Sequence, residues 1–219
     1  MPIEKLGQLT VTPILKVEEL TPNDCRIPVK YFELELPEIA KKANTGQFVM
    51  MWQFGNDEKP MGIAGVNESI VSFAVAKMGE ATTKFHELVK GDLLGIRGPF
   101  GRGFIIRGKS IAVMGGGTGI APIKFLVETA LRNNIKTTLF HGARTANELG
   151  FQDYFHNLAK KDKNFIYQPS TDDGTLGFKG FSTSCFEEAL RVKAHFDILY
   201  ACGPEMMMRT ALAKVEEKG

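Results

Sequence analysis

The chain has 219 residues, of which 43% are hydrophobic and 24% charged, with a formal net charge of +2. This balance is ordinary for a globular protein and excludes a disordered chain. The first 105 residues hold 12 basic and 13 acidic side chains, so neither half forms the basic field that nucleic acid binding needs. No apolar run approaches the roughly 18 residues that span a bilayer, and the N-terminus lacks the apolar core of a signal peptide. We therefore expect a cytoplasmic protein with no nucleic acid or membrane partner.

In the first hundred residues, short apolar segments are separated by turn residues. Phe32, Leu34 and Leu36 alternate with Glu33 and Glu35, which is the period-two pattern of a half-buried strand. We expect strands over 9–20, 29–37, 46–54, 60–65, 69–77 and 92–100, and one short helix that starts near Thr82. Strands at this spacing predict a β-sandwich or a closed β-barrel.

From residue 109 onward, buried apolar strands alternate with helical stretches. We expect strands over 110–114, 137–142, 164–168 and 196–201, with helices beginning near Ala121, Ala146, Ser182 and Glu205. This alternation predicts βαβ units and a parallel sheet covered on both faces. The sequence thus predicts two domains, over residues 1–105 and 106–219.

The segment VMGGGTGIAP, residues 113–122, follows the first of these later strands and begins a helix. It fails the dinucleotide fingerprint, because the sixth position counted from Gly115 is Ile120 and the second strand ends without an acidic residue. A backbone free of side chains beside a helix N-terminus still suits an anion such as a phosphate. The alternative is a tight turn that serves only strand-to-helix packing.

Three other loops follow strands of the same sheet and are expected at the same edge. Arg144 suits a phosphate or is a solvated charge near a helix. Cys202 suits a ligand contact or a structural position in the core. For Asp172 and Asp173 we expect a turn rather than catalysis.

The order of six segments resembles the ferredoxin reductase superfamily, which pairs an N-terminal flavin-binding β-barrel with a C-terminal nicotinamide-binding α/β domain. The segments are 46–52, 59–65, 79–85, 98–104, 115–122 and 201–207. Segments 142–149 and 171–180 are most similar to the electron-transfer subunits of dihydroorotate dehydrogenases, which serve pyrimidine biosynthesis. The resemblance implies FAD and NAD(P) as cofactors.

The resemblance also implies which residues bind the cofactors. They are Lys59, Pro60, Met61 and Gly62 along the flavin; Val75, Ala76 and Lys77 on the next strand; Thr82 and Thr83 at the pyrophosphate; and Gly116, Gly117 and Thr118 facing Cys202, Gly203 and Pro204 at the nicotinamide. Arg144, proposed above from its own chemistry, completes the expected cofactor-binding set. Hydride would pass from the nicotinamide to flavin N5, so the cofactor supplies the chemistry. We therefore expect no catalytic acid–base residue, and we expect core or surface roles for the four histidines.

Two departures from the family pattern matter. Relatives carry Arg-Pro-x-Ser where this chain has Lys59-Pro60-Met61-Gly62, so a bidentate arginine and a hydroxyl are missing and FAD is expected to bind more weakly. Close relatives continue into a tail with four cysteines that hold a [2Fe–2S] cluster, whereas the present sequence has only Cys25, Cys185 and Cys202. Either the chain is truncated or this member works without the cluster.

Three functions are compatible with these observations. The leading interpretation is an electron-transfer flavoprotein subunit that works with a dihydroorotate dehydrogenase-type catalytic subunit or another redox protein. The alternatives are a self-sufficient NAD(P)H-dependent ferredoxin or flavin reductase, and a flavin-less interaction module.

Overall fold

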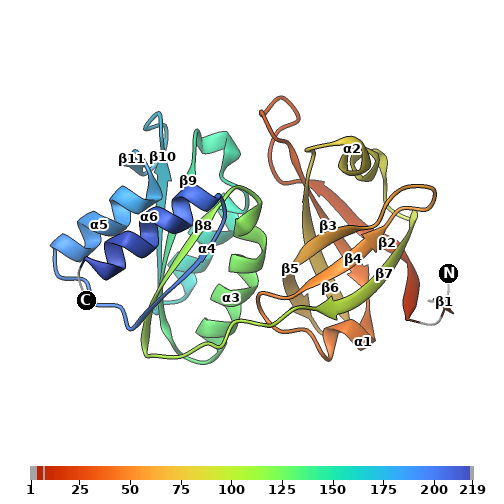
Figure 1. Ribbon diagram of the computed structural model, residues 1–219, viewed down its shortest axis with the longest axis horizontal. Coiled ribbons are helices and arrows are strands. Elements are labelled where there is room, and N and C mark those ends of the chain that lie inside the picture. The colour runs from red at the N-terminus through yellow and green to blue at the C-terminus, as the bar shows by residue number, and fades with distance from the viewer. Residues whose placement is uncertain (1–3, 7, 218–219) are drawn as a thin grey trace. The chain divides into compact units, whose positions relative to one another are not determined.

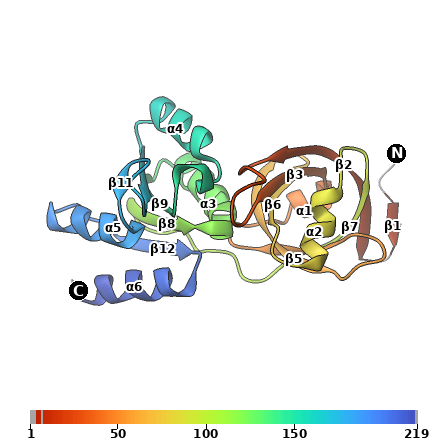
Figure 2. The same ribbon diagram turned by 90° about the horizontal axis from the view of Figure 1, so that it is seen from above.

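The computed structural model describes residues 4–6 and 8–217 and divides the chain into two compact units, up to Phe104 and from Ile105 onward (Figures 1 and 2). We refer to them as the barrel unit and the α/β unit. The predicted fold class is confirmed, since one unit is a closed antiparallel barrel and the other contains a parallel sheet.

The barrel unit is built on six strands that pair in a closed ring. The strands are β2 (Leu9–Glu19), β3 (Val29–Glu35), β4 (Phe48–Trp52), β5 (Lys59–Asn67), β6 (Ile70–Ala76) and β7 (Leu93–Phe100), with β1 (Glu4–Leu6) added beside β2. The ring runs β2-β3-β6-β5-β4-β7 and closes because β7 also pairs with β2. Phe32, Leu34 and Phe73 are fully buried inside it, so the predicted alternation along β3 is confirmed.

Two helices belong to the barrel unit, α1 (Pro37–Ala40) and α2 (Glu80–Glu87). His86 anchors α2 to the barrel, because its Nε2 lies 2.8 Å from the Val75 carbonyl of β6 and its own carbonyl accepts a hydrogen bond from Lys30 Nζ at 2.7 Å. Burial lowers the pKa of His86, so the ring is held neutral as a donor to that carbonyl. The last turn of α2 is thereby held against the end of β6.

The α/β unit contains a five-stranded parallel sheet in the order β11-β10-β9-β8-β12. Its strands are β8 (Ser110–Gly116), β9 (Lys136–Ala143), β10 (Phe165–Thr171), β11 (Phe178–Lys179) and β12 (Ile198–Cys202), and its helices are α3 (Ile120–Arg132), α4 (Gln152–Lys161), α5 (Ser182–Arg191) and α6 (Glu205–Glu216). Parallel pairing brings the carboxyl ends of β8, β9, β10 and β12 to one edge, where ligands bind in such sheets.

Helices cover both faces of this sheet, with α3 and α4 on one side and α5 and α6 on the other (Figure 2). On the α5 side, Phe140 of β9 lies edge-on to Phe186 with ring centroids 5.3 Å apart. On the α4 side, His141 of β9 faces Phe155 in the same manner at 6.0 Å. Adjacent residues of β9 thus point to opposite faces, as the pleat of a strand requires.

One predicted helix start is wrong. A helix was expected from Ala146, but only a short 3₁₀ turn occupies Ala146–Glu148, and α4 begins at Gln152. Phe151, with φ of 62°, adopts a left-handed conformation that a continuous helix cannot contain. The other three helices of this unit begin within one residue of the predicted positions.

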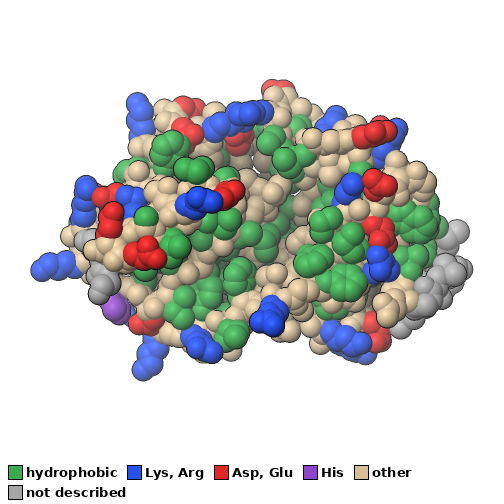
Figure 3. Space-filling view, in the orientation of Figure 1, with side chains coloured by type: hydrophobic (Ala, Val, Ile, Leu, Met, Phe, Trp, Pro, Cys, Tyr) green, Lys and Arg blue, Asp and Glu red, His purple; other side chains and the backbone are tan. Residues whose placement is uncertain are grey.

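Charged side chains of both signs are scattered over the face shown in Figure 3, in keeping with the small net charge. Within the part of the chain that the structure describes, every helix is too short or too polar to cross a bilayer.

Candidate functional site

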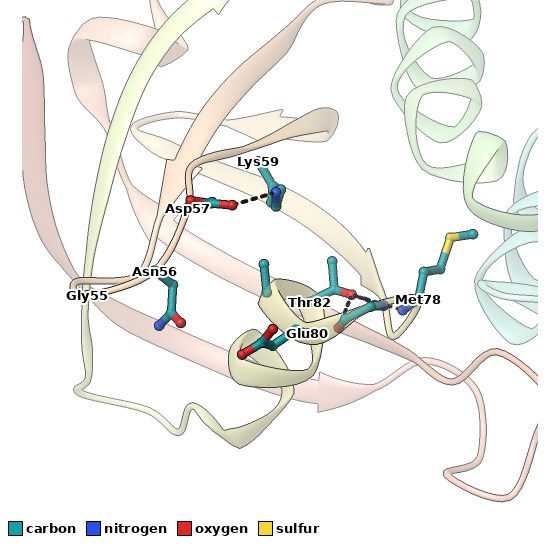
Figure 4. Close-up of a pocket in the computed structure, with 9 residues that line it drawn as sticks. Gly55, Asn56, Asp57, Lys59, Met78, Glu80 and Thr82 are labelled. Carbon is teal, nitrogen blue, oxygen red and sulfur yellow. Dashed lines mark hydrogen bonds and ion pairs between the residues drawn. The ribbon is translucent and has the colours of Figure 1, made fainter.

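The barrel unit contains a pocket of about 570 Å³ between the loop before β5 and the first turn of α2 (Figure 4). It is lined by Gly55, Asn56, Asp57, Lys59, Met78, Gly79, Glu80, Ala81 and Thr82. The first backbone N–H groups of a helix have no intrahelical partner and attract anions. A helix start, a lysine and an unhindered glycine at position 79 fit a phosphate-bearing ligand such as the pyrophosphate of FAD.

Thr82 shapes the helix start of this pocket. Its hydroxyl accepts hydrogen bonds from the backbone N–H groups of Met78 at 2.9 Å and Gly79 at 3.0 Å, and it donates to the Gly79 carbonyl at 3.1 Å (Figure 4). The hydroxyl therefore already has its partners in the loop. Thr82 thereby ties the loop at Met78 and Gly79 to the first turn of α2, whose own first N–H groups have no intrahelical partner.

Lys59 is the cation of the pocket, and a carboxylate partly neutralises it. Its Nζ lies 3.3 Å from Asp57 Oδ2, with the lysine side chain 37% exposed and the aspartate 85% exposed (Figure 4). Glu80 adds a second carboxylate to the lining. The pocket thus offers a phosphate less positive charge than a free arginine would.

The remaining predicted flavin residues lie on β5, β6 and α2, with Lys77 directly after β6, and do not line this pocket as the structure describes it. The side chains of Met61, Val75 and Ala76 are buried in the barrel, so these residues can meet a ligand chiefly through their backbone. Pro60 and Lys77 are exposed, and the Thr83 N–H is bonded to the Gly79 carbonyl at 2.9 Å.

In the α/β unit, the glycine loop between β8 and α3 combines two kinds of glycine. A Cβ on Gly119 would lie 2.3 Å from the Cys202 carbonyl oxygen, so this position must be glycine for the loop to pack against the end of β12. Gly117 has φ of +54° and only open space around its would-be Cβ. Gly119 therefore serves the packing of the loop, while the backbone at Gly117 is unobstructed.

The segment after β12 lies directly against this loop. A Cβ on Gly203 would lie 2.8 Å from the Gly116 carbonyl oxygen, and one on Gly116 would lie 3.0 Å from Met207 Sδ. Burial raises the pKa of the Cys202 thiol, which keeps it protonated. The structure thus brings Gly116 and Gly119 together with Cys202 and Gly203. Gly117, Thr118 and Pro204 are exposed.

Arg144 follows β9 directly and is paired with Glu148. Its Nε lies 3.0 Å from Glu148 Oε2, and its Nη2 donates to the other carboxylate oxygen. In the neighbouring loop, Asp173 accepts hydrogen bonds from the N–H and the hydroxyl of Thr175 at 2.9 and 2.7 Å, which places it in a turn as predicted.

Within residues 4–6 and 8–217, no group of three or more His, Cys, Asp or Glu side chains is placed to hold a metal ion. Cys185 lies on α5 and Cys202 at the end of β12, and with Cys25 they remain one thiol short of the four that a [2Fe–2S] cluster requires. His141 is fully buried, and burial lowers its pKa to about 3. The three cysteines alone therefore do not fit a cluster.

Comparison with known proteins identifies the family. Residues 113–212 match the model of the oxidoreductase NAD-binding domain. A probable dihydroorotate dehydrogenase B (NAD(+)) electron transfer subunit of Methanothermobacter thermautotrophicus is 34% identical over 215 residues, which cover 97% of this chain and 76% of that protein. The chain belongs to the family of dihydroorotate dehydrogenase B electron transfer subunits. The Methanocaldococcus jannaschii member is 42% identical over 172 residues, 78% of this chain and 63% of its own length.

Solved structures of flavin-dependent reductases share the fold of this chain. The NADH-dependent reduced ferredoxin-NADP oxidoreductase is 26% identical with a TM-score of 0.79, over 94% of this chain and 72% of that chain. A ferredoxin NADP+ reductase from Neisseria gonorrhoeae with bound FAD and NADP is 20% identical with a TM-score of 0.78, over 98% and 93% of the two chains, and shares the fold. The predicted superfamily is confirmed.

Two features of the site were missed in the sequence. Asp57 lies in the turn-forming segment before Lys59, and its short spacing from that lysine was the available signal. Glu148 lies four residues after Arg144, a spacing that favours an ion pair on a helical turn. Both carboxylates change what the neighbouring cation can do.

Proposed function

We propose that this chain is an electron-transfer flavoprotein subunit that moves electrons between a pyridine nucleotide and a dihydroorotate dehydrogenase-type catalytic subunit. One observation carries the proposal. The same chain contains a barrel unit with a pocket at the start of α2 that suits an anion, and an α/β unit with an exposed glycine loop after β8 of its parallel sheet. The family membership supports the partner. Cys185 and Cys202 are present as thiols, the state typical of the cytoplasm, where we place the reaction.

In this proposal the barrel unit holds FAD, which supplies the hydride and electron chemistry when bound. Lys59 and the first N–H groups of α2 bind the pyrophosphate, and Thr82 holds the loop at Met78 and Gly79 against the start of this helix. The backbones of Met61, Val75 and Ala76 contact the flavin, with Pro60, Gly62, Lys77 and Thr83 beside them.

The α/β unit holds the pyridine nucleotide in this proposal. Gly117 lets the nucleotide approach the backbone, and Gly116 and Thr118 line the same side of the nicotinamide. Cys202, Gly203 and Pro204 form the facing side, and Arg144 lies at the end of the next strand. These residues bind and orient the nucleotide without transferring a proton.

The test is reconstitution of the purified full chain with FAD, followed by NADH oxidation with an artificial acceptor. We expect a flavin absorption band and slow turnover that rises when the catalytic subunit of the same organism is added. Failure to take up FAD would refute the proposal and favour the flavin-less module. Fast turnover that the partner leaves unchanged would instead favour a self-sufficient reductase.

A lysine variant tests the pocket itself. Lys59→Gln should weaken FAD binding about tenfold, because one charge-assisted contact to phosphate is lost. Lys41→Gln is the matched control, since the Lys41 side chain, directly after α1, is 73% exposed and pairs only with Glu38 among the contacts described. Equal FAD affinity of the two variants would show that the pocket does not bind the pyrophosphate.

A further inference from the structure

Arg97 forms a bidentate ion pair beside the pocket of the barrel unit. Its Nε donates to Glu58 Oε1 at 2.8 Å, and its Nη2 donates to the other carboxylate oxygen. Met50 of β4 lies opposite both Arg97 of β7 and Pro60 of β5, so the pair reaches across one strand of the barrel. A bidentate pair fixes the orientation of the carboxylate as well as its position. Glu58 is thereby tied to β7.

As the structure describes the pocket, Glu58 is the one residue from position 55 to position 59 that does not line it. The lining takes in the other four, Gly55, Asn56, Asp57 and Lys59. The Glu58 side chain is 27% exposed, against 85% for that of Asp57. The pair with Arg97 therefore holds the Glu58 carboxylate away from the pocket, although its two neighbours in the chain belong to the lining.

Other contacts hold the rest of this loop. The Trp52 Nε1–H donates to the Asn56 carbonyl at 2.7 Å, and the Asn56 N–H donates to the Gln53 carbonyl at 3.0 Å. Neither bond involves Glu58 or Arg97. Loss of the ion pair would therefore leave this turn in place and release mainly the Glu58 side chain.

A released Glu58 would act on the pocket through its charge. The hydrogen bond from Arg97 lowers the pKa of the Glu58 carboxyl, so this group is ionised at neutral pH. The described lining holds one cation, Lys59, together with the carboxylates of Asp57 and Glu80. A third carboxylate next to Lys59 would compete with a phosphate for the lysine and would repel the phosphate itself.

We propose that Arg97 is a positioning residue that keeps the Glu58 carboxylate out of the pocket and so leaves Lys59 available to a phosphate. This rests on the proposed function, in which the pocket binds the pyrophosphate of FAD. Arg97 acts through Glu58 and needs no contact with the cofactor. Neither residue is among the cofactor-binding residues expected from the sequence.

Calorimetry with inorganic pyrophosphate at low ionic strength tests the proposal on the full chain. This probe presents two linked phosphates without the flavin or the adenosine. Arg97→Gln should weaken its binding about tenfold, because a carboxylate is freed beside the phosphate. Arg97→Lys keeps a cation beside Glu58 and should lose less than about threefold. In about 0.5 M sodium chloride the loss in Arg97→Gln should also shrink below about threefold, because salt screens exposed charges.

A second substitution separates this role from a purely structural one. The double substitution Arg97→Gln, Glu58→Gln should bind pyrophosphate within about twofold of the wild-type chain, because no carboxylate remains to be released. Glu58→Gln alone should not weaken binding. If the pair only stabilised the loop, all three variants would lose affinity alike. Arg209→Gln on α6 is the control, since Arg209 also pairs with a glutamate, Glu205, and both side chains are 72% exposed.

The outcomes separate this inference from the proposed function. Unchanged affinity in Arg97→Gln, an equal loss in Arg209→Gln, or a double variant as weak as Arg97→Gln overturns the role of Arg97. The expected pattern in a chain that takes up no FAD supports this role and refutes the flavoprotein function. Uptake of FAD without the pattern overturns the role of Arg97 and leaves the flavoprotein function standing. Binding of neither pyrophosphate nor FAD overturns both.

Discussion

His141 makes the stability of the α/β unit sensitive to acid. Its ring is fully buried, its Nδ1 lies 3.0 Å from the Tyr167 hydroxyl, and its Nε2 has no hydrogen-bond partner among the residues described. Burial lowers its pKa from the ordinary 6.5 to about 3. Because folding lowers this pKa, the histidine binds a proton more readily in the unfolded chain than in the folded one. The free energy of unfolding therefore falls as the pH drops below 6.5.

The magnitude follows from the two pKa values. At pH 7.5 the histidine is neutral in both states and contributes nothing to the pH dependence. At pH 5 the histidine is protonated in the unfolded chain and neutral in the folded one. This pH lies about 1.5 units below the ordinary pKa of 6.5, which corresponds to a loss of about 2 kcal/mol in the free energy of unfolding. The loss would reach its limit only near pH 3, where the folded histidine also titrates.

Urea unfolding at the two pH values measures this loss. Far-UV circular dichroism follows helices α3 to α6, and Trp52 on β4 reports on the barrel unit. The helix signal of the wild-type chain should lose about 2 kcal/mol more between pH 7.5 and 5 than that of His141→Gln. His195→Gln, at a side chain 84% exposed, should behave like the wild-type chain.

Equal pH dependence in the wild-type chain and in His141→Gln would refute this reasoning. If the variant does not fold, the wild-type chain still gives an answer by nuclear magnetic resonance. The ring protons of His141 should then show no titration between pH 7.5 and 5, and a titration near the ordinary value would contradict the burial argument.

Three further substitutions give distinct expectations. Asp57→Asn should strengthen FAD binding about two- to fivefold in a fluorescence titration, because it frees Lys59 from an exposed ion pair; unchanged affinity would exclude that role. Gly117→Ala should fold but lose about 1–2 kcal/mol in the free energy of unfolding, because alanine is strained in the left-handed backbone conformation. It should also weaken NADH binding, and normal NADH affinity would show that no ligand approaches this position. Gly119→Ala should lower the melting temperature more than Gly117→Ala, because its Cβ would collide with the Cys202 carbonyl, and the opposite order would contradict the packing role.

Much of the fold could be predicted from the sequence, because it depends on local periodicity. The alternation around Phe32 and Leu34 marks a strand with one buried face, and both side chains are fully buried. The start of α4 could not be read in this way, since it depends on the left-handed conformation of Phe151, a residue type that rarely adopts it. The two-residue strand β11 also has too few residues to show a period.

The interactions of the candidate site could not be read from the sequence. The family resemblance pointed to Lys59 and Thr82, and the position of Arg144 after a strand pointed to a phosphate contact. The sequence did not show that the Thr82 hydroxyl bonds the backbone of Met78 and Gly79, or that Arg144 is paired with Glu148. Such interactions depend on side-chain rotamers and on how the loops fold, which a motif does not encode. The roles of these residues in cofactor binding remain predictions.

The packing of the glycine loop against the end of β12 has a consequence for binding kinetics. Because the Cys202 carbonyl occupies the space beside Gly119, and the Gly116 carbonyl lies beside Gly203, neither segment can shift without moving the other. A nucleotide would therefore meet a loop that is already ordered, and association would carry little entropic cost from loop closure. Its association rate should then be governed by diffusion and charge rather than by a slow rearrangement of the protein.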